Sequence, residues 1–322
     1  MANLWPSYLN LLDAGELGQR VKAARELLRQ CRVCPRSCGT NRLEGGVGFC
    51  LTADVALVAS YNVHPGEEPC ISGTRGSGVI FFTSCNLRCV FCQNYPISHL
   101  EVGRPATGQH LAEMMLELMS RGVHNINFVT PSHVIPQILE ALLLAAQRGL
   151  DIPLVYNTSG YESLESLRLL DGIVDIYLPD AKYGSNENAM KYSKIDDYVE
   201  VNRAALKEMW RQVGPVVFDD KGLARRGMIL RHLVLPNGIA GTREVLGFAA
   251  REISPEITIS LMNQYFPANQ APGLPELSRR LTAQEYEAAV DFLWEAGLEK
   301  GYTQESDSLE GTDDPATLPA DS

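Results

Sequence analysis

Three cysteines, Cys85, Cys89 and Cys92, lie within eight residues, directly after the apolar run 78–83. Such a run predicts a β-strand, so the thiols would stand in a loop at its end. A structural zinc site takes four ligands, whereas three thiolates from one tight loop can hold an iron–sulfur cube whose fourth iron stays open. Disulfides are not built from neighbouring turns. The spacing therefore predicts a reactive cluster, with a zinc knuckle completed by Cys70 as the alternative.

A second group of four cysteines precedes the first, at Cys31, Cys34, Cys38 and Cys50. Four thiolates within twenty residues are enough to close a metal site. Zinc and an auxiliary [4Fe-4S] cluster both accept four sulfur ligands, and a three-thiolate site that leaves Cys50 free is a third possibility. The sequence therefore predicts an auxiliary zinc or iron–sulfur site and leaves the metal open.

Strands and helices alternate from residue 78 onward, as in a parallel α/β sheet. We expect strands near 78–83, 124–130, 153–158, 173–179, 228–235 and 257–263. We expect helices near 108–121, 132–148, 162–170, 197–212, 242–252 and 282–297, and an earlier amphipathic helix that includes Leu17 and Leu28. Six βα units predict an open, partial (β/α)6 barrel whose chemistry lies at the carboxyl ends of the strands.

Three segments follow from this pattern: an N-terminal helix and cysteine-rich metal-binding segment at 1–77, a partial barrel at 78–302, and a tail at 303–322. The tail contains six acidic and no basic side chains. Such a composition cannot bury a core, so we expect disorder there.

The composition limits which binding partners and which cellular compartment are expected. The chain has 322 residues, 45% of them hydrophobic, and a formal net charge of -11. Phosphate contacts need clustered Lys and Arg, so this charge argues against nucleic acid or an anionic membrane as the main partner. The longest strongly apolar run, 141–146, is too short to span a bilayer. The first twenty residues lack the pattern of a signal peptide, and clustered cysteines suit a reducing compartment, so we expect a cytoplasmic protein.

The stretch 82–95, Phe-Thr-Ser-Cys-Asn-Leu-Arg-Cys-Val-Phe-Cys-Gln-Asn-Tyr, resembles the cluster loop of radical S-adenosylmethionine (SAM) enzymes. It is most similar to the glycyl radical activating enzymes, in the branch of pyruvate formate-lyase activating enzyme homologues. Cys-Arg-Val-Cys-Pro-Arg at 31–36 and Gly-Val-Gly-Phe-Cys at 46–50 resemble the same branch. The family's shortest activating enzymes lack this segment.

The resemblance implies a partial radical SAM barrel with a [4Fe-4S] cluster on Cys85, Cys89 and Cys92. SAM would chelate the fourth iron and be cleaved reductively to a 5′-deoxyadenosyl radical, which would take hydrogen from a partner protein. An electron donor such as flavodoxin or ferredoxin would supply the electron. The protein's own task would be to aim the radical and exclude water.

The resemblance also marks cofactor-binding positions, most of them at strand ends. These are Phe91 beside the third cysteine, then Thr130, Ser132, Asn157, Asp180, Lys182 and His232. Lys182 would approach the SAM carboxylate. Three of these assignments have a purely structural alternative to cofactor binding. Ser132 could be a helix N-cap, Asp180 and Lys182 could form a simple salt bridge, and His232 could be a core residue.

Two other functions remain open at this point. One is a radical SAM enzyme that modifies a peptide or small molecule through the auxiliary metal site. The other is a zinc-binding or redox scaffold without catalysis.

Overall fold

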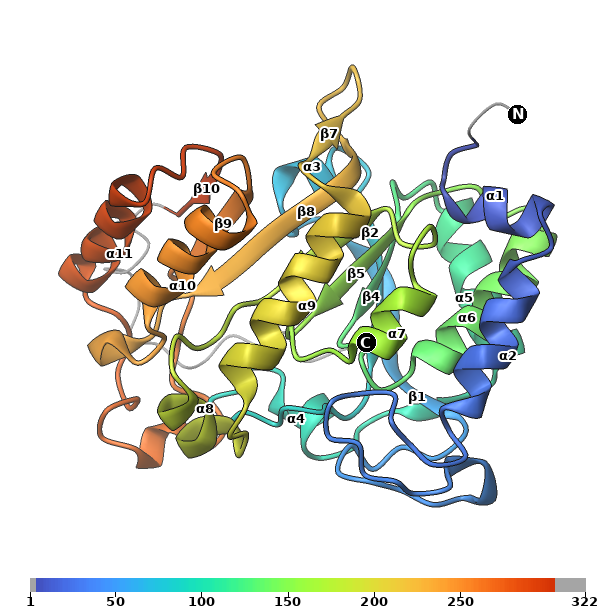
Figure 1. Cartoon of the computed structure of the whole chain (residues 1–322), viewed down its shortest axis with the longest axis horizontal. Helices are drawn as coiled ribbons and strands as arrows, with labels where there is room; N and C mark the ends of the chain where they lie inside the picture. Colours follow the sequence, from blue (N-terminus) through green and yellow to red (C-terminus); the bar gives the residue numbers. More distant parts are fainter. Residues whose placement is uncertain (1–3, 305–322) are drawn as a thin grey trace.

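A single curved sheet organises the chain, whose computed structural model describes residues 4–304. The strand order is β10-β9-β8-β6-β5-β4-β2-β1-β3, with β7 paired to β8 (Figure 1). The strands are β1 (Ala56–His64), β2 (Ser77–Phe82), β3 (Arg104–Ala106), β4 (Ile126–Val129), β5 (Leu154–Thr158), β6 (Ile176–Pro179), β7 (Val217–Phe218), β8 (Ala224–Leu233), β9 (Thr258–Met262) and β10 (Gly301–Thr303).

The six predicted barrel strands are all present, and they pair in parallel from β2 to β9. β1 adds to β2 in antiparallel register and β3 adds to β1, so this side of the barrel ends in antiparallel strands. The other side ends at β10, which pairs with β9 alone. The sheet is therefore open, which confirms the predicted partial barrel.

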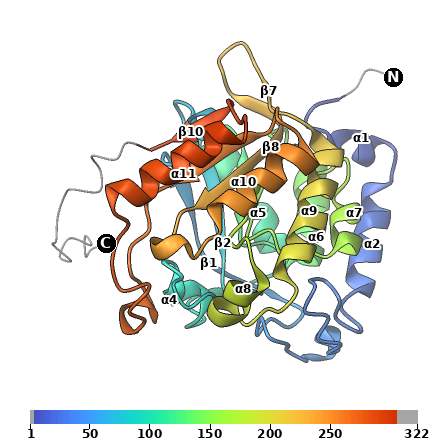
Figure 2. The same cartoon turned by 60° about the vertical axis from the view of Figure 1, so that its left-hand side comes forward.

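The longer helices cover the outer side of the sheet, while α3 (Pro69–Ser72) and α4 (Tyr95–Ser98) lie at its two ends (Figures 1 and 2). The other α-helices of the described residues are α1 (Tyr8–Asp13), α2 (Leu17–Glu26), α5 (Gly108–Ser120), α6 (Ile135–Gln147), α7 (Leu164–Leu169), α8 (Asn186–Ser193), α9 (Tyr198–Val213), α10 (Thr242–Phe248) and α11 (Ala283–Glu295). Short 3-10 turns cover Arg42–Glu44, Pro236–Gly238 and Ala271–Gly273.

Two predicted helices differ at their ends. α6 begins at Ile135 rather than near 132, because Pro136 fits only the first turn and residues 131–134 form a turn before it. α10 ends at Phe248 and continues as a π-turn, Ala249–Ile253.

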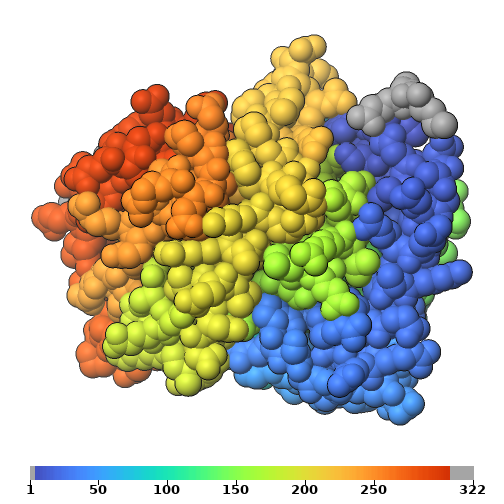
Figure 3. All heavy atoms as spheres, in the orientation of Figure 1, coloured from blue at the N-terminus to red at the C-terminus, as the bar shows by residue number. Residues whose placement is uncertain are grey.

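The N-terminal segment packs against the barrel. The Tyr8 hydroxyl donates to the carbonyls of Leu150 and Ile152, at 3.1 and 3.0 Å. The predicted amphipathic helix is present as α2 with Leu17 buried, but it ends at Glu26, so Leu28 is buried in the turn that follows it. In Figure 3 this segment forms one continuous surface with the later elements beside it.

The loop that contains α3 closes the amino-terminal end of the barrel. Cys70 and Ile71 are buried there against inward-facing residues of the strands, Val155, Ile176, Leu178, Ala224 and Ile229. Figure 1 shows α3 at the end where β8 begins, opposite α4. Within the described residues, the barrel is therefore blocked at this end.

No helix within residues 4–304 has the length and apolar character needed to cross a membrane. The first two residues of the tail predicted to be disordered are ordered. Thr303 is the last residue of β10, and the Gln304 side chain accepts a 2.6 Å hydrogen bond from the backbone of Asn263. The rest of that tail, 305–322, lies outside the described residues.

Candidate functional site

The cysteine loop leaves the carboxyl end of β2 through strained turns. Ser84 and Arg88 have φ values of 72° and 53°. This left-handed conformation is costly for residues with a side chain, so surrounding contacts must hold it. Asn86 supplies one of them, because its Nδ2 donates to the Tyr161 carbonyl at 2.8 Å. The loop is thus fixed by a residue that follows β5.

Each of the three sulfurs accepts a hydrogen bond. The donors are Leu87 N to Cys85 Sγ at 3.3 Å, Ser193 Oγ to Cys89 Sγ at 3.0 Å, and Ser98 Oγ to Cys92 Sγ at 3.1 Å. Hydrogen bonds to sulfur stabilise thiolate character and tune the potential of an iron–sulfur cluster. The loop therefore offers three prepared sulfur ligands.

Burial keeps the thiols of Cys85 and Cys89 protonated until a cation arrives. It raises the pKa of Cys85 to about 12, and it also raises the pKa of Cys89. A bound metal deprotonates such thiols outright. Three sulfurs from one loop, each with its own donor, fit a [4Fe-4S] cluster. The alternative zinc knuckle fails, because Cys70 lies at the opposite end of the barrel.

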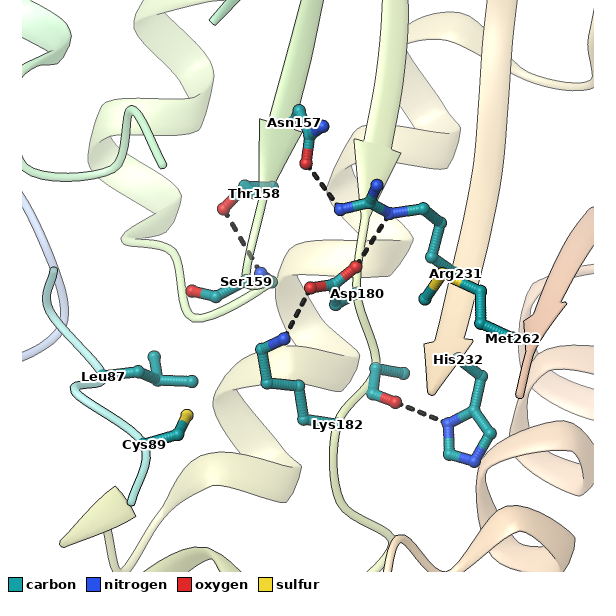
Figure 4. Close-up of polar contacts among 12 residues, drawn as sticks. Leu87, Cys89, Asn157, Thr158, Ser159, Asp180, Lys182, Arg231, His232 and Met262 are labelled. Atoms are coloured by element: carbon teal, nitrogen blue, oxygen red, sulfur yellow. Dashed lines mark hydrogen bonds and ion pairs between the residues drawn. The ribbon is translucent and has the colours of Figure 1, made fainter. Parts of the chain in front are cut away.

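A charged network joins the carboxyl ends of three barrel strands (Figure 4). Asp180 accepts a 2.6 Å hydrogen bond from Lys182 Nζ and a 2.9 Å hydrogen bond from Arg231 Nε. Arg231 Nη2 also donates to Asn157 Oδ1 at 2.6 Å. Burial opposes the ionisation of Asp180, but the two cations hold its pKa below the usual value. Asp180 is therefore a carboxylate next to two cations at this edge.

Gly160 permits this network to form. Its φ is +72°, and a Cβ there would lie 2.2 Å from the Asp180 carbonyl oxygen. Only glycine allows the end of β5 to approach the end of β6 this closely.

Arg231 was missed as a site residue, although it neighbours the predicted His232. Successive residues of a strand point to opposite sides, and Arg231 points into the barrel. His232 points outward, where its Nδ1 donates to the Ala181 carbonyl at 2.6 Å and its Nε2 accepts from the Thr242 hydroxyl at 2.9 Å. With both nitrogens occupied, this geometry does not support the predicted contact of His232 with a cofactor.

Glu67 extends the network into the barrel from the α3 loop. Its Oε1 accepts from Asn157 Nδ2 at 3.4 Å, and its Oε2 lies 3.7 Å from Arg231 Nη1. Burial raises the pKa of Glu67 to about 6. Glu67 stands in a polar, turn-rich passage, and nothing in the local sequence marks it as an inward-facing residue.

Ser132 is not the N-cap that it resembled in the sequence, and its cofactor contact stays a prediction. The N-cap of α6 is Val134. The Ser132 hydroxyl donates instead to Glu162 Oε1, which also accepts from the Thr158 hydroxyl. Burial raises the pKa of Glu162 to about 7. Glu162 is thus a buried carboxyl group that the sequence did not single out.

Two other predicted cofactor positions lie near the cysteine loop. Thr130, at the end of β4, has a left-handed φ of 59°, and its backbone N–H donates to the Asn157 carbonyl at 2.9 Å. Phe91 is buried between the rings of Tyr183 and Tyr265, with both centroid distances 6.2 Å. A cofactor contact for these residues stays a prediction.

The four N-terminal cysteines line one pocket, together with Arg36, Arg42 and His133. Cys31, Cys34 and Cys50 are buried and Cys38 is exposed. Within residues 4–304, no three His, Cys, Asp or Glu side chains are placed closely enough to hold a single metal ion. The structure thus gathers the four thiols without fixing a coordination geometry.

Comparisons with known proteins agree with this site. Residues 79–232 match the family model described as the Radical SAM superfamily. An uncharacterized protein of Methanocaldococcus jannaschii is 29% identical over 303 residues, which cover 91% of this chain and 81% of that protein.

Two solved structures are distantly similar. QueE from Escherichia coli has a TM-score of 0.40 and 11% identity, covering 66% of this chain and 86% of its own. Methylornithine synthase (PylB) has a TM-score of 0.46 and 11% identity, covering 88% and 69%. The family-model match, which includes the cysteine loop and ends at His232, supports assignment to the radical SAM superfamily.

Proposed function

We propose that this chain, as a member of the radical SAM superfamily, abstracts a hydrogen atom from a glycine or similar Cα of a partner protein. One observation carries the chemistry: three thiols of one loop accept hydrogen bonds, and one of them, Cys89, lies on the side of the charged network at the strand ends (Figure 4). The activating role and the protein substrate rest on the sequence resemblance and on the surface described below.

The cysteine loop would hold the cluster, and the strand ends would hold SAM. When bound and reduced, the cluster would supply the one-electron chemistry by which SAM is cleaved and hydrogen is taken from a substrate. Lys182 would bind the methionine carboxylate, and Asp180 would accept from the methionine ammonium group. Arg231 and Asn157 would keep Asp180 in place. A flavodoxin or ferredoxin would supply the electron.

A partner protein would approach from the carboxyl edge, because the α3 loop blocks the other end. Apolar side chains in segments beside the cysteine loop support docking there. Leu100, Val102 and Phe266 are 63%, 55% and 41% exposed. The segment that includes Phe266 is tied to the loop, since Gln93 Nε2 donates to the Gln264 carbonyl at 2.9 Å. An exposed apolar rim of this kind is typical of a protein interaction site.

A second candidate is a radical SAM enzyme that acts on a peptide or small molecule. The charged interior favours it, because Glu67 and Arg231 offer opposite charges inside the barrel, as a small zwitterion would require.

Anaerobic reconstitution followed by EPR tests the first proposal. We expect a reduced cluster whose EPR signal changes on addition of SAM, formation of 5′-deoxyadenosine, and a glycyl radical in a co-purifying partner. Deoxyadenosine without a protein radical in any co-expressed partner would favour the small substrate. A cluster that ignores SAM would overturn both proposals.

A further inference from the structure

The N-terminal thiol pocket contains a histidine from the barrel. His133, in the turn before α6, is 1% exposed. Its Nε2 lies 2.9 Å from the Thr83 carbonyl oxygen. A carbonyl only accepts, so Nε2 must carry the hydrogen and Nδ1 must present a lone pair. Among the described residues, Nδ1 is buried without a hydrogen-bond partner.

An imidazole in this state is prepared for a metal. Metal-ligating histidines almost always donate their other ring N–H to a carboxylate, a backbone carbonyl or water, which fixes the tautomer. A buried acceptor without any partner is otherwise costly and calls for a ligand. His133 shows both features, and it lines the same pocket as the four thiols.

We propose that this pocket holds a second metal centre with Nδ1 of His133 as one of its ligands and with the others drawn from the thiolates of Cys31, Cys34, Cys38 and Cys50. Sulfur and imidazole donors suit zinc or an iron–sulfur cluster. Side-chain rotations would bring the chosen donors onto the metal. Because the thiols belong to the N-terminal segment and the histidine to the barrel, the metal would bind the two together.

Arg42 supports an anionic site. Its side chain is 1% exposed, and its Nη1 donates to the His133 carbonyl at 2.8 Å and lies 3.9 Å from Cys31 Sγ. A buried guanidinium needs negative partners, and metal-bound thiolates provide them. Gly48 supports the sulfur positions, because a Cβ there would lie 2.3 Å from Cys38 Sγ.

The pocket also contacts the catalytic loop on both sides of Cys85. His133 bonds to the carbonyl of Thr83, two residues before it. Asn86, one residue after it, lines the pocket, and its carbonyl accepts from Arg36 Nε at 2.9 Å. The second centre would therefore brace the loop on which the proposed function depends.

The test uses the full chain with Cys85, Cys89 and Cys92 all changed to Ala, so that its outcome does not depend on the radical chemistry. After anaerobic purification, we expect metal analysis and sulfide assay to find one remaining centre per chain, either zinc or iron with sulfide. A chain that holds no metal, even after reconstitution with zinc or with iron and sulfide, would overturn the proposal.

The role of His133 is tested in the same background. His133→Ala should lose metal to a chelator at least tenfold faster and should shift the d–d bands of the Co²⁺-substituted site. His133→Cys should restore retention and add sulfur-to-cobalt charge transfer, which a purely structural role would not produce. His232→Ala, an equally buried histidine with both nitrogens bonded, is the matched control and should change neither readout. An unchanged cobalt spectrum in both His133 variants would exclude Nδ1 as a ligand.

Discussion

The two cysteine groups occupy different settings, although both gather thiols. In the barrel loop, each sulfur has a hydrogen-bond donor, and the loop follows directly from a central strand. In the N-terminal group, the segment has little regular structure, the Arg42 guanidinium lies 3.9 Å from the sulfur of Cys31, and Cys38 is exposed.

This difference separates two kinds of metal site. A site that performs chemistry needs ligands held by rigid elements and an open side that faces its reactants. A site that joins two parts of a chain needs donors from both parts, and the metal then provides the rigidity. The barrel loop fits the first design, and the N-terminal pocket, with the metal proposed above, would have the second.

The largest expected contrast comes from removing one thiol from each group. Cys89→Ala should reduce SAM cleavage below detection, because the cluster has only three protein ligands and is not held when one of them is removed. Cys34→Ala should retain a cluster EPR signal that changes on addition of SAM, with a lower yield of folded protein. Equal loss in both variants would show that the N-terminal group takes part in the chemistry.

Lys182 tests the charge at the strand ends. Lys182→Met should weaken SAM binding by roughly a hundredfold, because a charge-assisted contact worth about 2–3 kcal/mol is lost. Asp180 keeps Arg231 as a partner, so folding should persist. Lys191→Met is the matched control, since the Lys191–Glu276 ion pair lies at the surface, where solvent screens it. Calorimetric titration with SAM would measure both variants.

Glu162 makes stability depend on pH. Its folded pKa of about 7 exceeds the ordinary value of 4.5. Its stabilising contribution is therefore complete below pH 4.5 and declines as the pH rises through 7. Between pH 5 and 8, the wild-type free energy of unfolding should fall by on the order of 2 kcal/mol from this group, and Glu162→Gln should remove that slope. Urea unfolding at several pH values measures it, and parallel slopes would contradict the assignment.

Ser193 gives the smallest expected effect. The Ser193 hydroxyl donates to Cys89 Sγ, and such a hydrogen bond stabilises the reduced cluster because that state is the more negative one. Ser193→Ala removes this donor. A hydrogen bond of about 1 kcal/mol corresponds to roughly 40 mV for one electron, so the potential should fall by that amount. EPR-monitored redox titration tests this prediction, with Ser278→Ala as an exposed control. A potential that rises or does not move would show that this bond is unimportant.

The sequence predicted those parts of the molecule that local patterns determine. Short apolar runs located all six barrel strands, and the strand-end rule brought Asn157 and Asp180 together. Long-range partners were not predictable. Glu67 reaches Arg231 across 164 positions of the chain, and His133 meets cysteines about a hundred residues earlier. Ser132 resembled an N-cap because it stands just before α6. Its actual partner, Glu162, follows the next strand and cannot be identified from the local sequence.

Within residues 4–304, the α3 loop covers the amino-terminal end of the barrel. Under the proposed function, SAM, the partner and the released deoxyadenosine would therefore all use the carboxyl edge, beside the cysteine loop. SAM would bind first, the partner would then cover this edge, and deoxyadenosine would leave only after the partner. The docked partner would itself shield the reaction from water.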